Sequence, residues 1–178
     1  MDSPKEERIQ KLVKKAVRRD TEAYGQLIEY YKEYLYRTAY LFTGNQEQAL
    51  DIVGETILKG FRSIHKLKKP EYFRTWLTKI LMNTANDCYR RCPEMEDIES
   101  LAGQAAAAPE AGISIEERLD LNDAVSRLPH KYRAVIILKY FDELTIHEIA
   151  RVMGMPEGTV KAYLHRAKAE LRKYYQQL

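Results

Sequence analysis

Residues 144–171, LTIHEIARVMGMPEGTVKAYLHRAKAEL, decide how the C-terminal part of the chain folds. Thr145 and Glu148 have the spacing of a capping box, which starts a helix. Gly154 lies where a left-handed turn would end that helix, and Ala150 is small enough for a second helix to cross closely. These offsets predict a helix-turn-helix. Its shared core would contain Ile146, Ile149, Val160 and Leu164.

The outward face of the second helix in this motif is basic and polar. Six cationic or imidazole side chains lie on this face, together with only one carboxylate, Glu170. Such donors suit DNA phosphates and the acceptor edge of guanine. A solvated charged helix is the simpler alternative, but the basic stripe coincides with the helix-turn-helix spacing, which favours DNA binding. The side chains of this stripe are Lys161, His165, Arg166, Lys168, Arg172 and Lys173.

The rest of the chain also has apolar residues at helical spacing. Asp20 and Asn45 have the positions of N-caps, Gly44 would end a helix, and Pro70 interrupts the chain. Asn45 with Gln48 resembles a capping box, and the helix after it would turn Ile52, Val53, Ile57, Leu58 and Phe61 inward. Further helices are predicted over about 71–91, from a cap at Ser114 and Glu117 to Leu128, and over about 130–141. The sequence therefore predicts an all-α protein.

Charge divides the chain into three segments. Residues 1–91 hold 18 Lys and Arg against 12 Asp and Glu, residues 92–117 hold none against seven, and residues 118–178 hold 11 against seven. The middle segment also contains Pro, Gly and an Ala run without apolar periodicity, so we expect a flexible acidic linker there. The prediction is two small helical domains, 1–91 and 118–178, each with a surface for a polyanion.

Composition argues against membrane, metal and thiol chemistry. The 178-residue chain has no apolar run near the roughly 20 residues that cross a bilayer, and its start is charged where a signal peptide is apolar. We therefore expect a cytoplasmic protein without direct membrane insertion. Its four histidines lack metal-ligand spacing, and Cys88 and Cys92 are expected to be ordinary thiols in a reducing compartment. No metal site, cofactor or catalytic residue is predicted.

Two long stretches resemble a known family. LPHKYRAVIILKYFDELTIHEIARVMGMPEGTVKAYLHRAKAELRK, at 128–173, resembles region 4 of the extracytoplasmic-function group of bacterial sigma factors, in the sigma-70 family. YLYRTAYLFTGNQEQALDIVGETILKGFRSI, at 34–64, and PEYFRTWLTKILMNTANDCYRR, at 70–91, resemble region 2 of the same group, in the same order and at the same spacing. The resemblance implies a promoter-specificity subunit of RNA polymerase that has no enzymatic activity of its own.

The resemblance implies a docking surface for core RNA polymerase. Asp51, Glu55 and Thr56 match the positions at which the family binds the coiled-coil clamp of the β′ subunit, and region 4 would meet the β flap. Family members commonly have an acidic residue in place of Leu50 and a glutamine in place of Gly54. A glycine inside a helix costs about 1 kcal/mol relative to alanine, so this surface is expected to differ in strength or shape.

The resemblance also assigns DNA contacts in region 2, where the family recognises and opens the minus-10 element. Lysines can follow a backbone, and aromatic rings can stack on an unpaired base. Helical spacing places Trp76 with the core, which leaves Tyr72 as the better stacking candidate. The expected minus-10 contacts are Lys66, Lys68, Lys69, Tyr72, Asn83, Asn86, Asp87, Arg90 and Arg91.

In region 4 the family places the second helix of the motif in the major groove of the minus-35 element. Arg166 could pair with guanine through two hydrogen bonds. Ala162 and Tyr163 stand where the family often has Ser-Arg, which removes a donor and leaves Tyr163 to stack, to contact the backbone or to pack. The expected minus-35 contacts are Thr159, Lys161, Ala162, Tyr163, His165 and Arg166.

Three further expectations concern partners. The family resemblance implies promoter DNA and an anti-sigma factor, commonly membrane-bound, that would hold the protein at the inner face of the membrane. A stand-alone helix-turn-helix regulator is an alternative, and it would dimerise and bind duplex DNA without polymerase. A helical adaptor that binds only protein is a second alternative, and it would be indifferent to Lys161 and Arg166.

Overall fold

The computed structural model describes residues 4–91 and 122–175, and both ranges are helical, without a strand in either. The N-terminal bundle consists of α1 (Pro4–Val17), α2 (Thr21–Thr43), α3 (Gln46–Ser63), the short 3₁₀ turns η1 (Ile64–Lys66) and η2 (Pro70–Tyr72), and α4 (Phe73–Arg91). The predicted linker, Cys92 and the predicted cap at Ser114 and Glu117 lie outside the described residues.

Caps end the helices of the N-terminal bundle where the sequence predicts them. The Asp20 side chain accepts a hydrogen bond from the Ala23 backbone N–H at 3.0 Å, and Gly44 ends α2 in the left-handed conformation at φ +66°. Asn45 accepts one from the Gln48 backbone N–H at 3.0 Å. The reciprocal hydrogen bond to the Gln48 side chain is missing, because the Gln48 Oε1 is buried without a hydrogen-bond partner. The predicted capping box is therefore only half formed.

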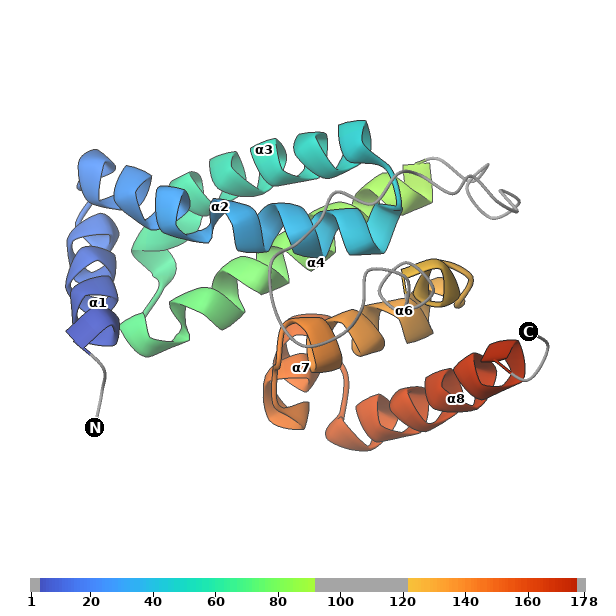
Figure 1. The fold of residues 1–178 in the computed structure, drawn as a ribbon. Helices are drawn as coiled ribbons and strands as arrows, with labels where there is room; N and C mark the ends of the chain where they lie inside the picture. The colour runs from blue at the N-terminus through green and yellow to red at the C-terminus, as the bar shows by residue number, and fades with distance from the viewer. Residues whose placement is uncertain (1–3, 92–121, 176–178) are drawn as a thin grey trace.

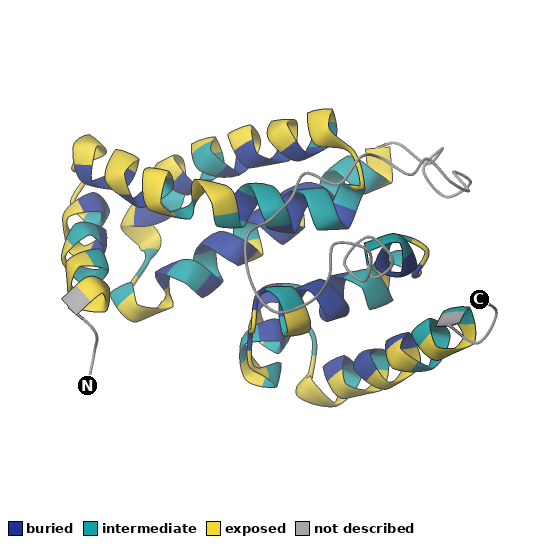
Figure 2. Ribbon diagram, viewed as in Figure 1, coloured by how far each residue is buried: buried dark blue, intermediate teal, exposed yellow. Residues whose placement is uncertain are grey.

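Three long helices enclose the core of the N-terminal bundle. Leu27 and Leu35 of α2 and Phe73, Leu77 and Leu81 of α4 are fully buried, and α3 packs against both helices. Figure 2 shows the buried side of each helix turned toward its neighbours and the exposed side turned out. Burying one such side chain contributes about 1.5–3 kcal/mol, so this core holds α2, α3 and α4 together.

The prediction that Leu58 and Phe61 point inward is wrong. Leu58 is 58% exposed and Phe61 is 45% exposed. The inward stripe of α3 instead runs through Ile52, Thr56 and Gly60, one helical turn apart. Because a buried threonine and a glycine are not apolar signals, periodicity alone shifts the predicted stripe toward the large residues beside it.

The described part of the C-terminal bundle comprises helical residues 122–126, α6 (His130–Ile136), the π-helical turn η4 (Ile137–Phe141), α7 (Ile146–Met153) and α8 (Glu157–Tyr175). The sequence predicts a single helix over 130–141. Its second half is wound more loosely, and the Asp142 N–H donates to the Ile137 carbonyl at 3.0 Å. Such turns are rare and frequently mark functional positions.

The helix-turn-helix has the predicted construction. Thr145 and Glu148 form a complete capping box, in which each side chain accepts from the other residue's backbone N–H. Gly154 ends α7 at φ +64°, and the Val160 side chain is fully buried under the crossing of α7 and α8. The cap, the turn and the corner together fix the angle at which α8 leaves the bundle.

The two bundles pack against each other. Figure 1 shows the N-terminal bundle lying across the C-terminal one, and α4 contacts α7 while α2 contacts η4 and α6. The side chains in this contact come mostly from the C-terminal end of α2, the start of α4 and the turn after η4. No sequence pattern predicts how the two bundles are oriented.

Gly60 gives a direct test of how α2 packs against α3 inside the N-terminal bundle. A Cβ built at Gly60 would lie 2.5 Å from the Tyr24 hydroxyl, which donates to the Ile57 carbonyl at 2.8 Å. Gly60→Ala should therefore displace Tyr24 and lower the free energy of unfolding by about 1–3 kcal/mol. Gly25→Ala on α2, where nothing lies within 4 Å, should instead raise it by about 0.5–1 kcal/mol. Urea denaturation followed by Trp76 fluorescence measures both; equal effects would contradict the packing.

Candidate nucleic-acid and polymerase interface

Helix α8 presents an exposed cationic face. Lys161, Ala162, His165 and Arg166 are exposed on it, whereas Thr159 is half-buried. Tyr163 faces away from these residues, since it packs on the core and its ring lies 5.6 Å from that of Tyr132. The structure therefore brings four of the six predicted minus-35 residues together and gives Tyr163 a packing role.

The charges on this face are available to a ligand. Further along α8, Lys173 pairs with Glu170 at 2.9 Å and the Lys168 ammonium lies 5.4 Å from the Tyr140 ring. Within residues 4–91 and 122–175, by contrast, no ion pair or ring contact engages Lys161 or Arg166. The exposed face at the N-terminal half of α8 thus carries unneutralised donors of the kind that bind phosphate or guanine.

Four of the residues predicted to contact the minus-10 element lie in the loop between α3 and α4. Lys66, Lys68 and Lys69 are exposed there, and Tyr72 is 38% exposed. The Lys69 ammonium lies 5.7 Å from the Tyr72 ring. Trp76 is half-buried and packs against the Phe73 ring at 5.8 Å, as expected for a residue associated with the core.

The C-terminal bundle covers one side of this loop. The Arg151 guanidinium of α7 lies 5.1 Å from the centre of the Tyr72 ring. A largely apolar groove of about 750 Å³ runs between the two bundles here, with Tyr72 and Trp76 on one wall and Ala150, Arg151 and Met155 on the other. Sequence reasoning missed Arg151, because no local pattern predicts a contact between residues so far apart in the chain.

The other minus-10 candidates lie along α4. Asn83 is exposed, and Asn86 and Asp87 are half-buried near the same face, which continues to Arg90 and Arg91 at the end of the helix. Asp87 lies 4.0 Å from the Lys59 ammonium, so it carries a structural ion pair between α4 and α3. The face is polar and ends in two cations.

Helix α3 carries the polymerase candidates. Asp51 and Glu55 are exposed one turn apart, and a hydrogen bond from Lys59 at 2.7 Å lowers the pKa of Glu55. Thr56 is completely buried, and its hydroxyl donates to the Ile52 carbonyl at 2.6 Å. Thr56 therefore lies inside the bundle, away from the surface that Asp51 and Glu55 share.

Apolar side chains flank the two carboxylates on the outer face of α3. Leu50 is 54% exposed, and Leu58 and Phe61 continue the same face toward the end of the helix. Gly54 lies between them with open space around its Cα. Exposed apolar stripes of this kind are typical of surfaces at which proteins bind one another. Sequence periodicity missed Leu58 and Phe61 because it assigned them to the core.

Comparison with known proteins decides the family. The family model "Sigma-70 region 2" matches residues 27–92, and "Sigma-70, region 4" matches residues 118–171. The ECF RNA polymerase sigma factor SigW of Bacillus subtilis is 31% identical over 183 residues, covering 96% of this chain and 98% of SigW. The chain belongs to the extracytoplasmic-function sigma factors. It is therefore a transcription initiation factor and not an enzyme.

Two further sigma factors agree with this assignment. The RNA polymerase sigma factor SigV of Bacillus subtilis is 35% identical over 147 residues, covering 80% of this chain and 84% of SigV. The solved structure of the sigma factor RpoE in complex with the anti-sigma factor NepR, from Bartonella quintana, has a TM-score of 0.69 at 21% identity and covers 88% of this chain and 98% of RpoE. This second likeness supports the fold. The N-terminal bundle corresponds to region 2 and the C-terminal bundle to region 4.

Membrane spans and metal clusters are absent from the described residues. No helix within residues 4–91 and 122–175 is long and apolar enough to cross a membrane. Over the same residues, no group of three or more His, Cys, Asp or Glu side chains is arranged to hold a metal ion.

Proposed function

We propose that this sigma factor binds core RNA polymerase through α3 and reads two promoter elements, one with the loop and α4 of region 2 and the other with α8 of region 4. The observation that carries the proposal is the exposed cationic face of α8, at which Lys161 and Arg166 lack partners within the described residues. The alternative of a stand-alone helix-turn-helix regulator is not favoured, because the matched families include region 2 as well as region 4.

Polymerase docking is assigned to the outer face of α3. Its two carboxylates suit a basic partner, and Leu50, Leu58 and Phe61 add apolar area that a partner helix can cover. Gly54 leaves no side chain between them, so a helix of the partner can approach the α3 backbone closely. These features support docking of α3 on the coiled-coil clamp of the β′ subunit. A second contact, between region 4 and the β flap, rests on the family resemblance.

Minus-10 recognition is assigned to the α3–α4 loop and to α4. Lys66, Lys68 and Lys69 provide exposed charge beside Tyr72, which is the combination that holds an unstacked base next to its backbone. Asn83 offers both donors and acceptors from the polar face of α4, and the two arginines that end α4 can hold phosphates. Duplex opening would follow from binding the separated strand more tightly than the duplex.

Minus-35 recognition is assigned to the N-terminal half of α8. We assign Arg166 to a two-point contact with guanine, Lys161 and Thr159 to phosphates, and His165 to either. Ala162 presents only a methyl group, which suits apolar contact with thymine. The helix-turn-helix fixes α8 at the corner of region 4, so these side chains act as one rigid surface.

An inhibitory protein partner is part of the proposal. The solved complex of RpoE with the anti-sigma factor NepR supports the expectation that this chain also has an anti-sigma partner. Attachment of that partner to a membrane, and a cytoplasmic location for the sigma factor itself, rest on the family resemblance.

The minus-35 assignment predicts a selective decrease in transcription. Changing Lys161 and Arg166 together to alanine should lower transcription from a promoter that the wild-type protein supports by at least about tenfold, since one two-point base contact is worth about 1–3 kcal/mol. The salt dependence of DNA binding should also become shallower by about one ion for each phosphate that the variant no longer binds. Polymerase affinity should stay unchanged. Lys131→Ala, which removes an exposed cation of region 4 outside α8, is the control; equal activity of the double variant and the control would contradict the assignment.

The docking assignment predicts the opposite selectivity. Asp51→Asn and Glu55→Gln should each weaken polymerase binding about two- to fivefold at low salt and less at high salt, because exposed ion pairs are weak and screened. Leu58→Ser should weaken binding at both salt concentrations, because burial of apolar area is not screened. Titration of labelled sigma factor with core polymerase measures all three. Glu33→Gln, an exposed carboxylate on α2, is the control, and a decrease of the same size there would reject α3 as the docking face.

A further inference from the structure

We propose that regions 2 and 4 of the free protein are held together by a polar latch centred on Asp142, and that this closed form withholds the Tyr72 loop from DNA until the latch opens. The latch comprises Asp142, Arg37, Thr38, Arg74 and Arg133. The contacts of the latch depend only on the fold, whereas its effect on DNA binding rests on the role proposed above for Tyr72.

The carboxylate of Asp142 is the centre of the latch. Asp142 follows η4 in region 4, and its side chain is fully buried against region 2. The Thr38 hydroxyl of α2 lies 3.0 and 3.1 Å from its two oxygens and can donate its one proton to either, and the Arg37 guanidinium lies 3.6 Å away. A buried carboxylate is stable only when it is paired and hydrogen-bonded, so removing region 2 would return this group to water.

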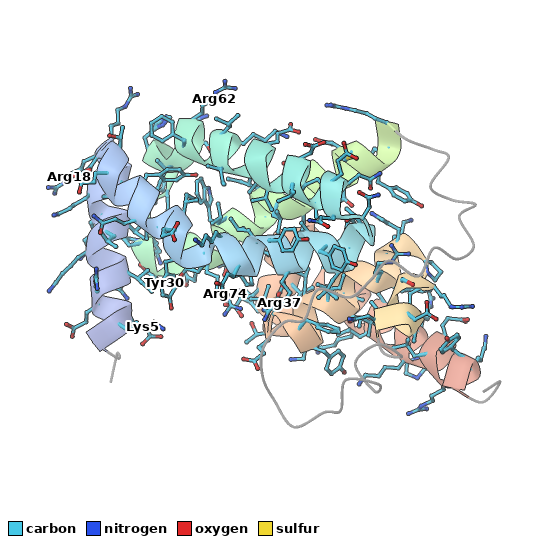
Figure 3. The ribbon with its side chains drawn as sticks, turned by 45° about the horizontal axis from the view of Figure 1, so that its top comes forward. Lys5, Arg18, Tyr30, Arg37, Arg62 and Arg74 are labelled. Atoms are coloured by element: carbon cyan, nitrogen blue, oxygen red, sulfur yellow. The ribbon has the colours of Figure 1, made fainter. Side chains whose placement is uncertain are left out.

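Arginines from each region cap the helix ends of the other. Arg37 donates to the Phe141 carbonyl at 3.2 Å, and Arg74 donates to the Asp142 carbonyl at 2.6 Å. In the opposite direction, Arg133 of region 4 donates to the Phe42 carbonyl at the end of α2, at 2.9 Å. The last carbonyls of a helix lack partners within the helix and carry partial negative charge, so these three bonds satisfy and stabilise both ends. Figure 3 shows Arg37 and Arg74 close together where the two bundles meet.

An aromatic cluster extends the same interface. The His130 ring of region 4 stacks on Tyr89 of α4 at 4.1 Å and meets Phe42 of α2 edge-on at 4.3 Å. Burial between these rings, together with the charges of Arg133 and Lys131, lowers the pKa of His130 to about 4. The histidine is therefore neutral in the closed form at neutral pH.

The closed form places region 4 against one of the minus-10 candidates, Tyr72. Arg151 of α7 covers the Tyr72 ring, and the Thr75 hydroxyl lies 3.5 Å from a carboxylate oxygen of Glu148. A base cannot stack on a ring face that a guanidinium already occupies. The wall opposite Tyr72 and Trp76 is formed by α7 and the turn after it, so region 4 narrows the approach to the Tyr72 ring while the two regions stay together.

The polar part of the interface can open easily. It consists of hydrogen bonds and an ion pair in which the Arg37 side chain stays 40% exposed, and such contacts exchange for water at little net cost. The buried apolar side chains of the two regions also form one cluster, so opening the interface exposes apolar area as well.

The latch is tested in the full-length protein without polymerase. Trp76 is the only tryptophan and lines the groove between the regions, so its acrylamide quenching reports opening, and small-angle scattering reports expansion. Asp142→Lys places a cation beside Arg37 and Arg74 and should at least double the quenching constant and enlarge the radius of gyration. Glu143→Lys makes the same charge change at the next, exposed residue and should leave both measurements at the wild-type value.

A variant from the other side of the interface excludes a local folding defect. Arg74→Ser removes the donor to the Asp142 carbonyl without altering region 4, and it should also raise quenching while circular dichroism stays at the wild-type helical content. A normally folded Arg74→Ser protein that remains as compact and as poorly quenched as the wild type would overturn the latch, whatever Asp142→Lys does.

The effect on DNA is measured with a labelled single strand of mixed sequence, about 20 nucleotides long, which exceeds the site size of one binding module. Asp142→Lys should bind it several-fold more tightly than Glu143→Lys, and Tyr72→Ala in the Asp142→Lys background should remove the gain. Increased quenching without tighter binding would keep the latch and overturn the withholding of Tyr72. Both results are independent of polymerase docking, so they remain distinguishable from a failure of the proposed sigma activity.

Two groups in the interface titrate with opposite effects on closure. Burial raises the pKa of Asp142 to about 6 from 3.8, although the Thr38 hydrogen bond and the charges of Arg37 and Arg74 lower it. Protonated Asp142 therefore stabilises the closed form at low pH, and this stabilisation is lost as the pH rises through about 6. For His130 the closed form is favoured above its ordinary pKa of 6.5, and that advantage is lost as pH falls toward about 4. Tyr34 of α2 also faces Asp142, and Tyr89 of α4 faces His130.

Replacing one of these two groups should leave closure with the pH dependence of the other. In the Arg74→Ser background, in which we expect both forms to be populated, His130→Gln should make closure more favourable on going from about pH 7.5 to about pH 5. Asp142→Asn in the same background should make closure less favourable over that range. Trp76 quenching measures both. Slopes of the same sign in the two variants would contradict the assignment of these groups to the interface.

Discussion

The buried carboxylate of Asp142 is the central polar contact between the two halves of the molecule. It is withdrawn from water and depends on Thr38 and Arg37 of the other region for its hydrogen bond and its countercharge. The same interface positions α7 beside the α3–α4 loop, forms the groove beside Trp76 and places Arg151 against Tyr72. The orientation of region 4 is thereby linked to the accessibility of Tyr72 in region 2.

Surfaces that point away from this interface carry the interactions proposed with larger partners. Helix α8 leaves region 4 with Lys161 and Arg166 exposed, and α3 presents two carboxylates among exposed leucines on the outside of region 2. The two surfaces differ in chemistry, since α8 carries unpaired positive charge and α3 carries exposed apolar area. Cationic donors suit a nucleic acid, and an apolar stripe with acidic neighbours suits a basic protein helix. The two faces therefore point to two different partners of one initiation complex.

The sequence correctly predicts the caps and turns that depend on residues close together in the chain. The Thr145 capping box, the left-handed Gly154 and the Asp20 cap follow from residues three or four apart, and all three are present. It failed where a distant contact decides the outcome. Leu58 was assigned to the core because a buried Thr56 and Gly60 carry no apolar signal, and the pairing of Tyr72 with Arg151 depends on a bundle orientation that no periodicity encodes. Thr56 matched a family motif, yet its hydroxyl serves the backbone of its own helix.

Promoter selection by polymerase is the central claim, and mapping of transcription start sites tests it most directly. Purified core polymerase would transcribe a library of genomic fragments with and without the full-length protein, and the 5′ ends of the transcripts would be sequenced. The account predicts that the protein creates a discrete new set of start sites that share two upstream elements. Start sites that are the same in the presence and absence of the protein would contradict it.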